Sequence, residues 1–184
     1  MQAVPDFDGP AILEVLLRHG VLCIVIGGFA AVAQGSPIPT IDLDVVPANE
    51  RENWARLSAA LTELDARVRA VELDEPLPFS HDAESLAASR NWNLTTKFGD
   101  LDLTQVPAGT EGYDDLKRDA VESDVDGMRV QLASLADIVR STEAAGRDKD
   151  RLALPALREL VALQLREKTA RPPAGPRARN KADN

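Results

Sequence analysis

Two acidic residues stand inside an apolar stretch of this chain, and they constrain its fold more than any other feature. Asp42 and Asp44 lie in the segment TIDLDVV, where Leu43 and Val45 occupy the alternate positions. Side chains alternate between the two faces of a strand, so both carboxylates project from one face, about 7 Å apart, while the apolar side chains enter a core. Two such charges repel each other, and a bound cation is the usual remedy. Oxygen ligands favour Mg²⁺ or Mn²⁺ over zinc, so the segment predicts a metal-binding strand.

A pair of glycines precedes this strand. The apolar run VLCIVI, residues 21–26, predicts a central strand, and Gly27 and Gly28 follow it at the start of a short helix. Glycine lets the backbone approach a phosphate closely, and the start of a helix favours the anion. A Gly-Gly turn alone is more often a tight connection between a strand and a helix. Combined with the acidic strand that follows, it predicts a site for a metal-bound triphosphate.

A third acidic residue has a similar setting. Asp102 lies between Leu101 and Leu103 in the segment GDLDLTQ. Asp100 shares its face, but we assign it to a turn at residues 98–100. Three strand carboxylates can hold two metal ions, which orient a triphosphate, stabilise the leaving pyrophosphate and activate an attacking hydroxyl. The third carboxylate can itself serve as the general base.

The composition limits the class of protein. The chain has 184 residues, of which 44% are apolar, enough for one domain with a core. Its net charge of −9 argues against broad non-specific binding to nucleic acid. The single cysteine, Cys23, allows no internal disulfide, and the acidic N-terminal residues do not resemble a signal peptide. We therefore expect a cytoplasmic protein with no membrane association.

The hydrophobic pattern places helices at both ends and strands in the middle. This order predicts an α+β (α/β) domain with a mixed β-sheet flanked by helices. The predicted helices cover residues 10–19, 28–34, 50–68, 112–120, 134–145 and 150–168, the last interrupted or kinked near Pro155. The predicted strands cover residues 21–26, 40–47, 69–73, two strands within 92–106, and a hairpin within 121–134. We divide the chain into a core at 1–133, a C-terminal helical segment packed on it at 134–168, and a disordered basic tail at 169–184.

Together these motifs resemble the nucleotidyltransferase superfamily of the DNA polymerase β type. Its minimal pattern is an apolar strand, Gly-Gly or Gly-Ser, a short helix, an acid-x-acid strand, and a third acid on a later strand. The matching segments here are VIGGFAAVAQG, TIDLDVV and GDLDL. The later segment LADIVRSTEAAGRDKDRLALPAL resembles the C-terminal helical segment of AbiEii-like toxins, including the MenT group. The resemblance covers about residues 10–165.

The resemblance implies a function and a set of site residues. Family members transfer a nucleoside monophosphate from an NTP to an acceptor. In MenT-like toxins the acceptor is the 3′ end of tRNA, which stops translation, and a cognate antitoxin protein restrains the toxin. The implied catalytic residues and metal ligands are Asp42, Asp44 and Asp102, with Mg²⁺ or Mn²⁺ as the cofactor. The implied nucleotide-binding residues are Gly27, Gly28, Ser36, Thr40, Lys97, Arg147 and Asp150.

Two positions depart from the family pattern. Thr142 stands where related sequences tend to have a lysine, and Ile38 stands where a basic residue is common. If that lysine holds the triphosphate, then Arg140, Arg147 or Lys97 must replace it. The departures keep two alternatives open: a weakened nucleotide-binding module, and a transferase that acts on a small molecule or a protein.

Hydroxyl groups on the loop before the acidic strand allow a further hypothesis. Ser36 and Thr40 there are typical of turn and cap chemistry. Either is also a possible modification site, because a phosphate on Thr40 would repel both Asp42 and the incoming NTP.

The string DLDVV also matches the opening motif of haloacid-dehalogenase-like phosphatases, whose first aspartate is a nucleophile. That fold has a long apolar strand directly before the aspartate, whereas Pro37 and Pro39 interrupt it here. It also gives no role to the glycine pair, so we prefer the nucleotidyltransferase interpretation.

Overall fold

Seven helices and seven strands make up the part of the chain that the computed structural model describes, residues 6–69, 76–78 and 80–170. The helices are α1 (Gly9–Arg18), α2 (Gly27–Ala33), α3 (Arg51–Glu63), α4 (Ala83–Ala88), α5 (Tyr113–Lys117), α6 (Leu135–Ala145) and α7 (Asp148–Ala170). The strands are β1 (Cys23–Ile26), β2 (Asp42–Pro47), β3 (Arg67–Val68), β4 (Asn91–Thr96), β5 (Gly99–Thr104), β6 (Val121–Val125) and β7 (Met128–Leu132).

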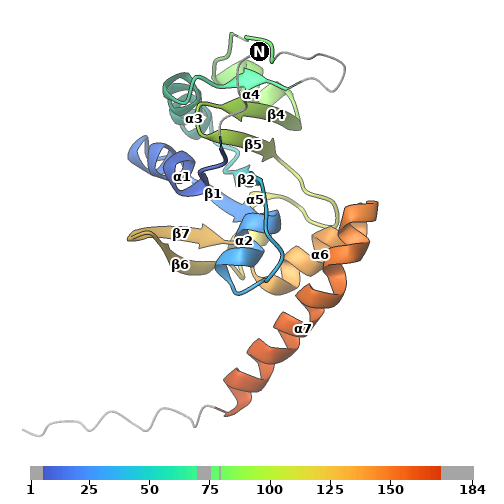
Figure 1. Ribbon diagram of the computed structural model, residues 1–184. Coiled ribbons are helices and arrows are strands. Elements are labelled where there is room, and N and C mark those ends of the chain that lie inside the picture. The colour runs from blue at the N-terminus through green and yellow to red at the C-terminus, as the bar shows by residue number, and fades with distance from the viewer. Residues whose placement is uncertain (1–5, 70–75, 79, 171–184) are drawn as a thin grey trace, which may run out of the picture.

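One mixed sheet contains all of these strands, in the order β3-β4-β5-β2-β1-β7-β6 (Figure 1). β2 pairs in parallel with β5, and β1 in parallel with β7, while the other neighbours are antiparallel. The predicted α+β class with a mixed sheet is therefore confirmed. The chain order alone did not give the parallel pairing of β2 with β5, which joins strands that are far apart in the sequence.

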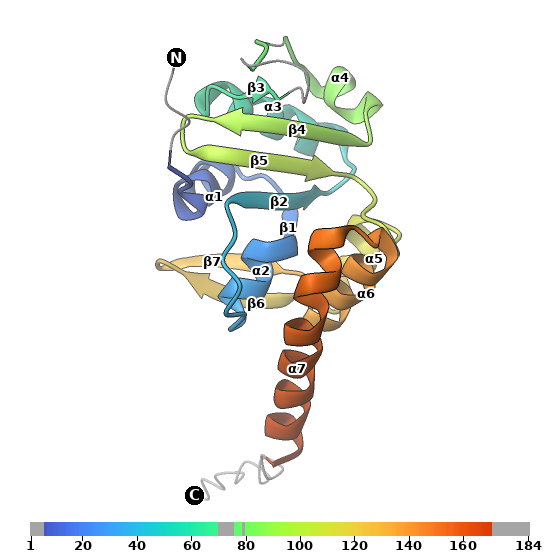
Figure 2. The same ribbon diagram turned by 45° about the vertical axis from the view of Figure 1, so that its right-hand side comes forward.

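Helices cover both faces of the sheet. α1 and α3 lie on one side, and α2, α6 and α7 on the other (Figures 1 and 2). Leu43 and Val45 of β2 are at most 1% exposed, as are Leu57 and Leu61 of α3. Burial of these alternating side chains leaves the opposite face of β2 for the aspartates.

Local signals set several of the element boundaries. The side chain of Asp8 accepts a hydrogen bond from the backbone N–H of Ala11 at 3.0 Å and so caps α1. Ser134 caps α6 in the same way, accepting from the N–H of Asp137 at 3.1 Å. Gly146 ends α6 in the left-handed conformation, with φ of 62°. These predicted boundaries are confirmed.

Other boundaries differ from the prediction. α4 was not predicted, although Asp82 and Ser85 form a reciprocal capping box at its start. The expected strand at 69–73 lies mostly outside the described residues, and β3 ends before it. α7 continues through Pro155, which is exposed, so water can satisfy the carbonyl group that loses its donor. The expected tail lies outside the described residues from position 171 onward.

None of the helices within the described ranges combines the length and the apolar character that crossing a lipid bilayer requires.

Candidate active site

Four aspartates from two neighbouring strands lie side by side on one face of the sheet. In the parallel pairing of β2 with β5, Asp42 stands opposite Asp100 and Asp44 opposite Asp102. All four are partly buried, whereas Leu43 between the first two is fully buried. Two carboxylates about 7 Å apart on one strand repel by about 2 kcal/mol at an effective dielectric constant of 20. Each pair therefore needs compensation from its surroundings.

The expectation that Asp100 belongs to a turn is wrong. Thr96 pairs with Gly99, so the turn between β4 and β5 is tight and β5 begins before Asp100. Thr95 donates its hydroxyl hydrogen to Asp100 Oδ1 at 2.8 Å. The sequence did contain a signal, because the aspartates of β5 repeat the acid-x-acid pattern of β2. The glycine at the turn obscured it.

The glycine pair fits tightly against β2. Gly27 has φ of +71°, and a Cβ there would overlap the carboxylate of Asp44. A Cβ at Gly28 would lie 2.7 Å from Thr40 Oγ1. Thr40 in turn donates its hydroxyl hydrogen to Asp42 Oδ1 at 2.7 Å. The backbone at the start of α2 therefore approaches the β2 carboxylates as closely as only glycine permits.

A cavity of about 450 Å³ opens beside these residues, between α2, the loop before β2, α6 and α7. It brings together most of the predicted site residues. These are Gly27, Gly28, Ser36, Thr40, Asp42, Asp44, Arg147 and Asp150. Thr142 and the apolar side chains of Ile138 and Leu157 complete much of the opposite wall.

Among the described residues that line this cavity, Arg147 is the cationic one. Its Nε donates to Asp150 Oδ2 at 2.8 Å, and its backbone N–H donates to the same oxygen at 3.1 Å. The hydrogen bond that the guanidinium donates to Asp150 is the main cause that raises the pKa of Arg147, and the negative charges of Asp44 and Asp42 contribute. Asp150, only 6% exposed, thus positions a guanidinium within electrostatic reach of the β2 carboxylates.

Two predicted site residues do not line the cavity. Lys97 lies at the turn between β4 and β5, where its ammonium group is 5.1 Å from the centroid of the Phe98 ring. Asp102 lies on β5, one strand away from the cavity-lining Asp44.

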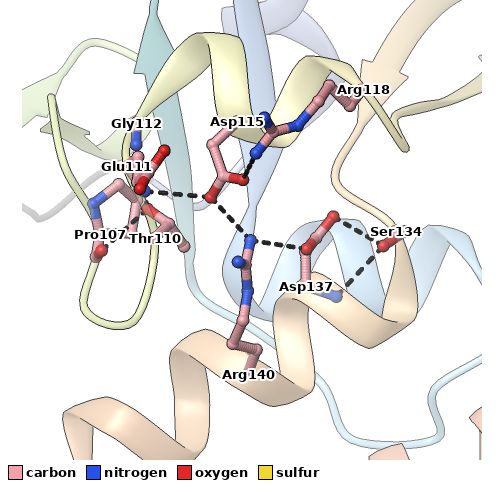
Figure 3. A network of polar contacts seen from close by, with 9 residues as sticks. All are labelled: Pro107, Thr110, Glu111, Gly112, Asp115, Arg118, Ser134, Asp137 and Arg140. Carbon is pink, nitrogen blue, oxygen red and sulfur yellow. Dashed lines mark hydrogen bonds and ion pairs between the residues drawn. The ribbon is translucent and has the colours of Figure 1, made fainter.

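Arg140 does not line the cavity and forms ion pairs in another cluster, which Figure 3 shows. Its Nη2 donates to Asp115 and to Asp137, both at 2.8 Å, and so links α5 with α6. Arg118 also pairs with Asp115. The pKa of Asp115 is lowered, chiefly because the backbone N–H of Glu111 donates to its carboxylate. Among the arginines suggested to replace the family lysine, Arg147 therefore has the better placement.

Arg69 is a residue of the site that sequence reasoning missed. It follows β3, and its side chain reaches over β4 to form ion pairs with both Asp100 and Asp102. The Nη2 atom lies 2.8 Å from Asp102 Oδ1. No local motif marks this arginine, since its role depends on the pairing of β3 with β4 and of β4 with β5.

The donor set of β2 fits a hard divalent cation. Asp42 and Asp44 supply carboxylate oxygens, and Mg²⁺ commonly binds through one or two carboxylates together with substrate phosphates. Within residues 6–69, 76–78 and 80–170, no group of three acidic, histidine or cysteine side chains is arranged as a complete metal site. A cation held here would take further ligands from a nucleotide or from water.

Comparison with known proteins identifies the fold. No family model and no curated protein sequence matches the chain. Among solved structures, it is similar to the lincosamide antibiotic adenylyltransferase LnuA, with a TM-score of 0.56 and 10% identity over 84% of this chain and 99% of LnuA. It is also similar to ANT(2″)-Ia in complex with adenylyl-2″-tobramycin, with a TM-score of 0.51 and 17% identity over 86% of this chain and 93% of the other.

The protein therefore has a nucleotidyltransferase fold. The likeness includes nearly the whole length of both neighbours, so it is not limited to a shared strand-helix unit. At these identities it establishes the fold, while the activity has to be argued from the site.

Proposed function

We propose that the protein transfers a nucleoside monophosphate from an NTP to an acceptor. The observation that carries this proposal is the close fit of Gly27 against Asp44 at the edge of the cavity. A backbone turn without side chains and a pair of carboxylates on the next strand form one site. Such a site suits a triphosphate whose charge is shared with a divalent cation.

Each group has a role in this proposal. Asp42 and Asp44 hold the cation, which when bound stabilises the developing charge on the phosphate oxygens. Arg147 contacts the terminal phosphates, because a guanidinium matches phosphate geometry. Asp150 holds Arg147 in place, and Gly27 with Gly28 leaves room for the phosphates.

The loop before β2 supplies hydroxyl groups. Ser36 Oγ accepts a hydrogen bond from the N–H of Ile38 at 3.2 Å, which leaves its hydroxyl hydrogen available to a phosphate oxygen. Thr40 orients the carboxylate of Asp42 and lies over Gly28. We also retain Thr40 and Ser36 as proposed modification sites. A Thr40→Glu variant that kept full activity would argue against that role for Thr40.

The reaction itself requires a base on the acceptor side. Asp102, one strand beyond Asp44, is the proposed general base for the acceptor hydroxyl. The acceptor oxygen forms a bond to the α-phosphorus, the bond to the bridging oxygen breaks, and pyrophosphate leaves. The acceptor would enter over β5 and β4, on the side of the aspartates away from the cavity.

For the acceptor, we propose the 3′ end of tRNA, with the protein acting as a toxin that blocks translation and is restrained by a cognate antitoxin. The resemblance to AbiEii and MenT-like sequences supports this proposal. The shared segment includes α6, the short connection after it and the start of α7, which place Thr142, Arg147 and Asp150 respectively at the cavity.

A small-molecule acceptor is the second candidate, favoured by the charges of the surface. Many arginines are already engaged in ion pairs, which reduces the guanidinium groups available for the phosphates of a nucleic acid. Apart from Arg147, which we assign to the NTP, they are Arg18, Arg67, Arg69, Arg118, Arg129, Arg140, Arg151 and Arg158. The solved neighbours are named for acting on a lincosamide and for holding adenylyl-tobramycin, which are small molecules.

One experiment separates these candidates. Each of four α-³²P-labelled NTPs is incubated with the protein, Mg²⁺ and either total tRNA or a panel of aminoglycosides and lincosamides. Label on tRNA supports the proposed tRNA-modifying toxin, and label on a small molecule supports the second candidate. An Asp44→Asn protein is the matched control. Nucleotide binding without transfer to any acceptor would instead indicate a non-catalytic module.

A further inference from the structure

The guanidinium of Arg69 forms an ion pair with Asp102, the carboxylate that the proposed reaction needs as its general base on the acceptor side. Arg69 Nη2 lies 2.8 Å from Asp102 Oδ1, and its Nη1 pairs with Asp100. The side chains of Asp100 and Asp102 are each 20% exposed, and that of Arg69 is 35% exposed. The contact is thus partly shielded from water, which strengthens it relative to a surface ion pair.

The arrangement around Arg69 is well defined. Its backbone N–H donates to the carbonyl oxygen of Asn93 on β4 at 2.9 Å, which fixes where the side chain starts. Thr95, also on β4, donates its hydroxyl hydrogen to Asp100 Oδ1, while Arg69 pairs with the other oxygen, Oδ2. The two nitrogens at the end of the guanidinium match two carboxylates spaced i, i+2 along one strand. Arg69 therefore compensates the β5 pair from within the chain.

We propose that Arg69 is a positioning residue that competes with a divalent cation for Asp102. This inference rests on the proposed nucleotidyltransferase function of the site. In the resting protein Arg69 holds Asp102, and the β2 carboxylates are the ones that bind a cation. A second cation, or the acceptor hydroxyl, engages Asp102 only when Arg69 moves away, because two cations near one carboxylate oxygen repel each other.

The proposal is tested by measuring Mn²⁺ binding, which does not depend on turnover. Free Mn²⁺ is followed by electron paramagnetic resonance during additions to the purified full chain, without nucleotide. We expect Arg69→Gln to bind one more Mn²⁺ per chain than the wild type, or to bind Mn²⁺ at least about fivefold more tightly. Arg67→Gln is the matched control, because Arg67 on β3 pairs with the exposed Asp65 at 3.4 Å. Its isotherm should equal that of the wild type.

Further variants locate the effect. Asp102→Asn added to Arg69→Gln should remove the gain in Mn²⁺ binding. Equal isotherms for the wild type and Arg69→Gln would overturn the proposal, as would a gain that persists in the double variant. If Arg69→Gln does not fold, Arg69→Lys carries the test. Lysine keeps the positive charge but cannot pair with both carboxylates through two nitrogens, so we expect a smaller increase in Mn²⁺ binding. An isotherm equal to that of the wild type would again overturn the proposal.

The outcome is separable from the proposed function. If the proposed function fails, wild-type Mn²⁺ binding will be insensitive to Asp44→Asn and no NTP will be consumed. If only the present inference fails, Asp44→Asn will abolish Mn²⁺ binding while Arg69→Gln leaves it unchanged.

Discussion

The acidic pairs of β2 and β5 share a motif, a face of the sheet and a register, yet their surroundings differ. The β5 pair receives a guanidinium and a hydroxyl from its own side of the sheet, through Arg69 and Thr95. The β2 pair faces the cavity, where the backbone at Gly27 approaches it. The same acid-x-acid pattern thus becomes an ion-paired cluster on β5, whereas on β2 it lines the cavity, where we propose that it binds a cation. The neighbouring elements decide which role each pair takes.

A third acidic cluster, formed by Asp115 and Asp137 with Arg140, lies outside the cavity and connects two helices. Arg140 bridges Asp115 and Asp137 as Arg69 bridges the β5 pair, but it links α5 to α6 and does not line the cavity (Figure 3). This cluster serves as a reference for the two strand pairs.

The largest effect on nucleotide transfer is expected when one carboxylate of the β2 pair is removed. Asp44→Asn should reduce nucleotide transfer by about a thousandfold or more, because a bound cation contributes several kcal/mol to the transition state. The melting temperature should stay equal or rise, since one of two repelling charges is removed. Label transfer and thermal melting measure both. Retained transfer in Asp44→Asn would sink the cation role of this pair.

The next effect concerns the approach of the backbone to β2. Gly27→Ala should lower transfer by about a hundredfold, because the new methyl group meets the carboxylate of Asp44. Gly127→Ala is the control, since Gly127 has φ of +82° but no atom lies within 4 Å of the place that its Cβ would take. Both variants carry a backbone strain of about 1–2 kcal/mol, so their melting temperatures fall. Equal activity of the two variants would contradict the proposed phosphate site.

A smaller effect is expected at the cation of the cavity. Arg147→Ala should raise the KM for the NTP about tenfold or more, because a charged hydrogen bond contributes about 1.5–3 kcal/mol. Arg158→Ala is the control, because Arg158 lies on α7, the helix that follows Arg147, pairs with Glu143 at 2.7 Å and does not line the cavity. Steady-state kinetics measure both variants. An unchanged KM in Arg147→Ala would assign the triphosphate to other residues.

The smallest expected effect is on the stability of the fold, and it concerns Asp115 in the cluster around Arg140. The lowered pKa of Asp115 means that its carboxylate stabilises the fold above the ordinary carboxyl pKa of about 4, and that this is lost as the pH falls through the lowered value. Asp115→Asn should melt a few degrees below the wild type at pH 7. The difference should shrink below about pH 4. Asp114→Asn, at an exposed position on the same helix, should show neither change.

Much of the fold was predictable because its signals are local. Caps such as Asp8 and Ser134, glycines at turns and the alternation of apolar residues act within a few positions. α4 was not predicted because its apolar pattern is short and lies in a polar region, and its capping box alone was too weak a signal. The strand expected at 69–73 lies mostly outside the described residues, and β3 has only two residues, too few for an alternation of apolar and polar side chains to show in the sequence.

The sequence by itself determined the acidic strand, the glycine pair and their proximity, because a strand, a turn and a short helix return the chain to the same place. It also indicated Arg147 and Asp150 through the family resemblance. Only the tertiary structure decided that Asp100 joins the sheet, that Arg140 is committed to a remote cluster and that Arg69 holds the β5 pair. These roles depend on contacts between segments far apart in the chain, such as the ion pairs of Arg69 with β5 and of Arg140 with Asp115, so no short stretch of sequence records them.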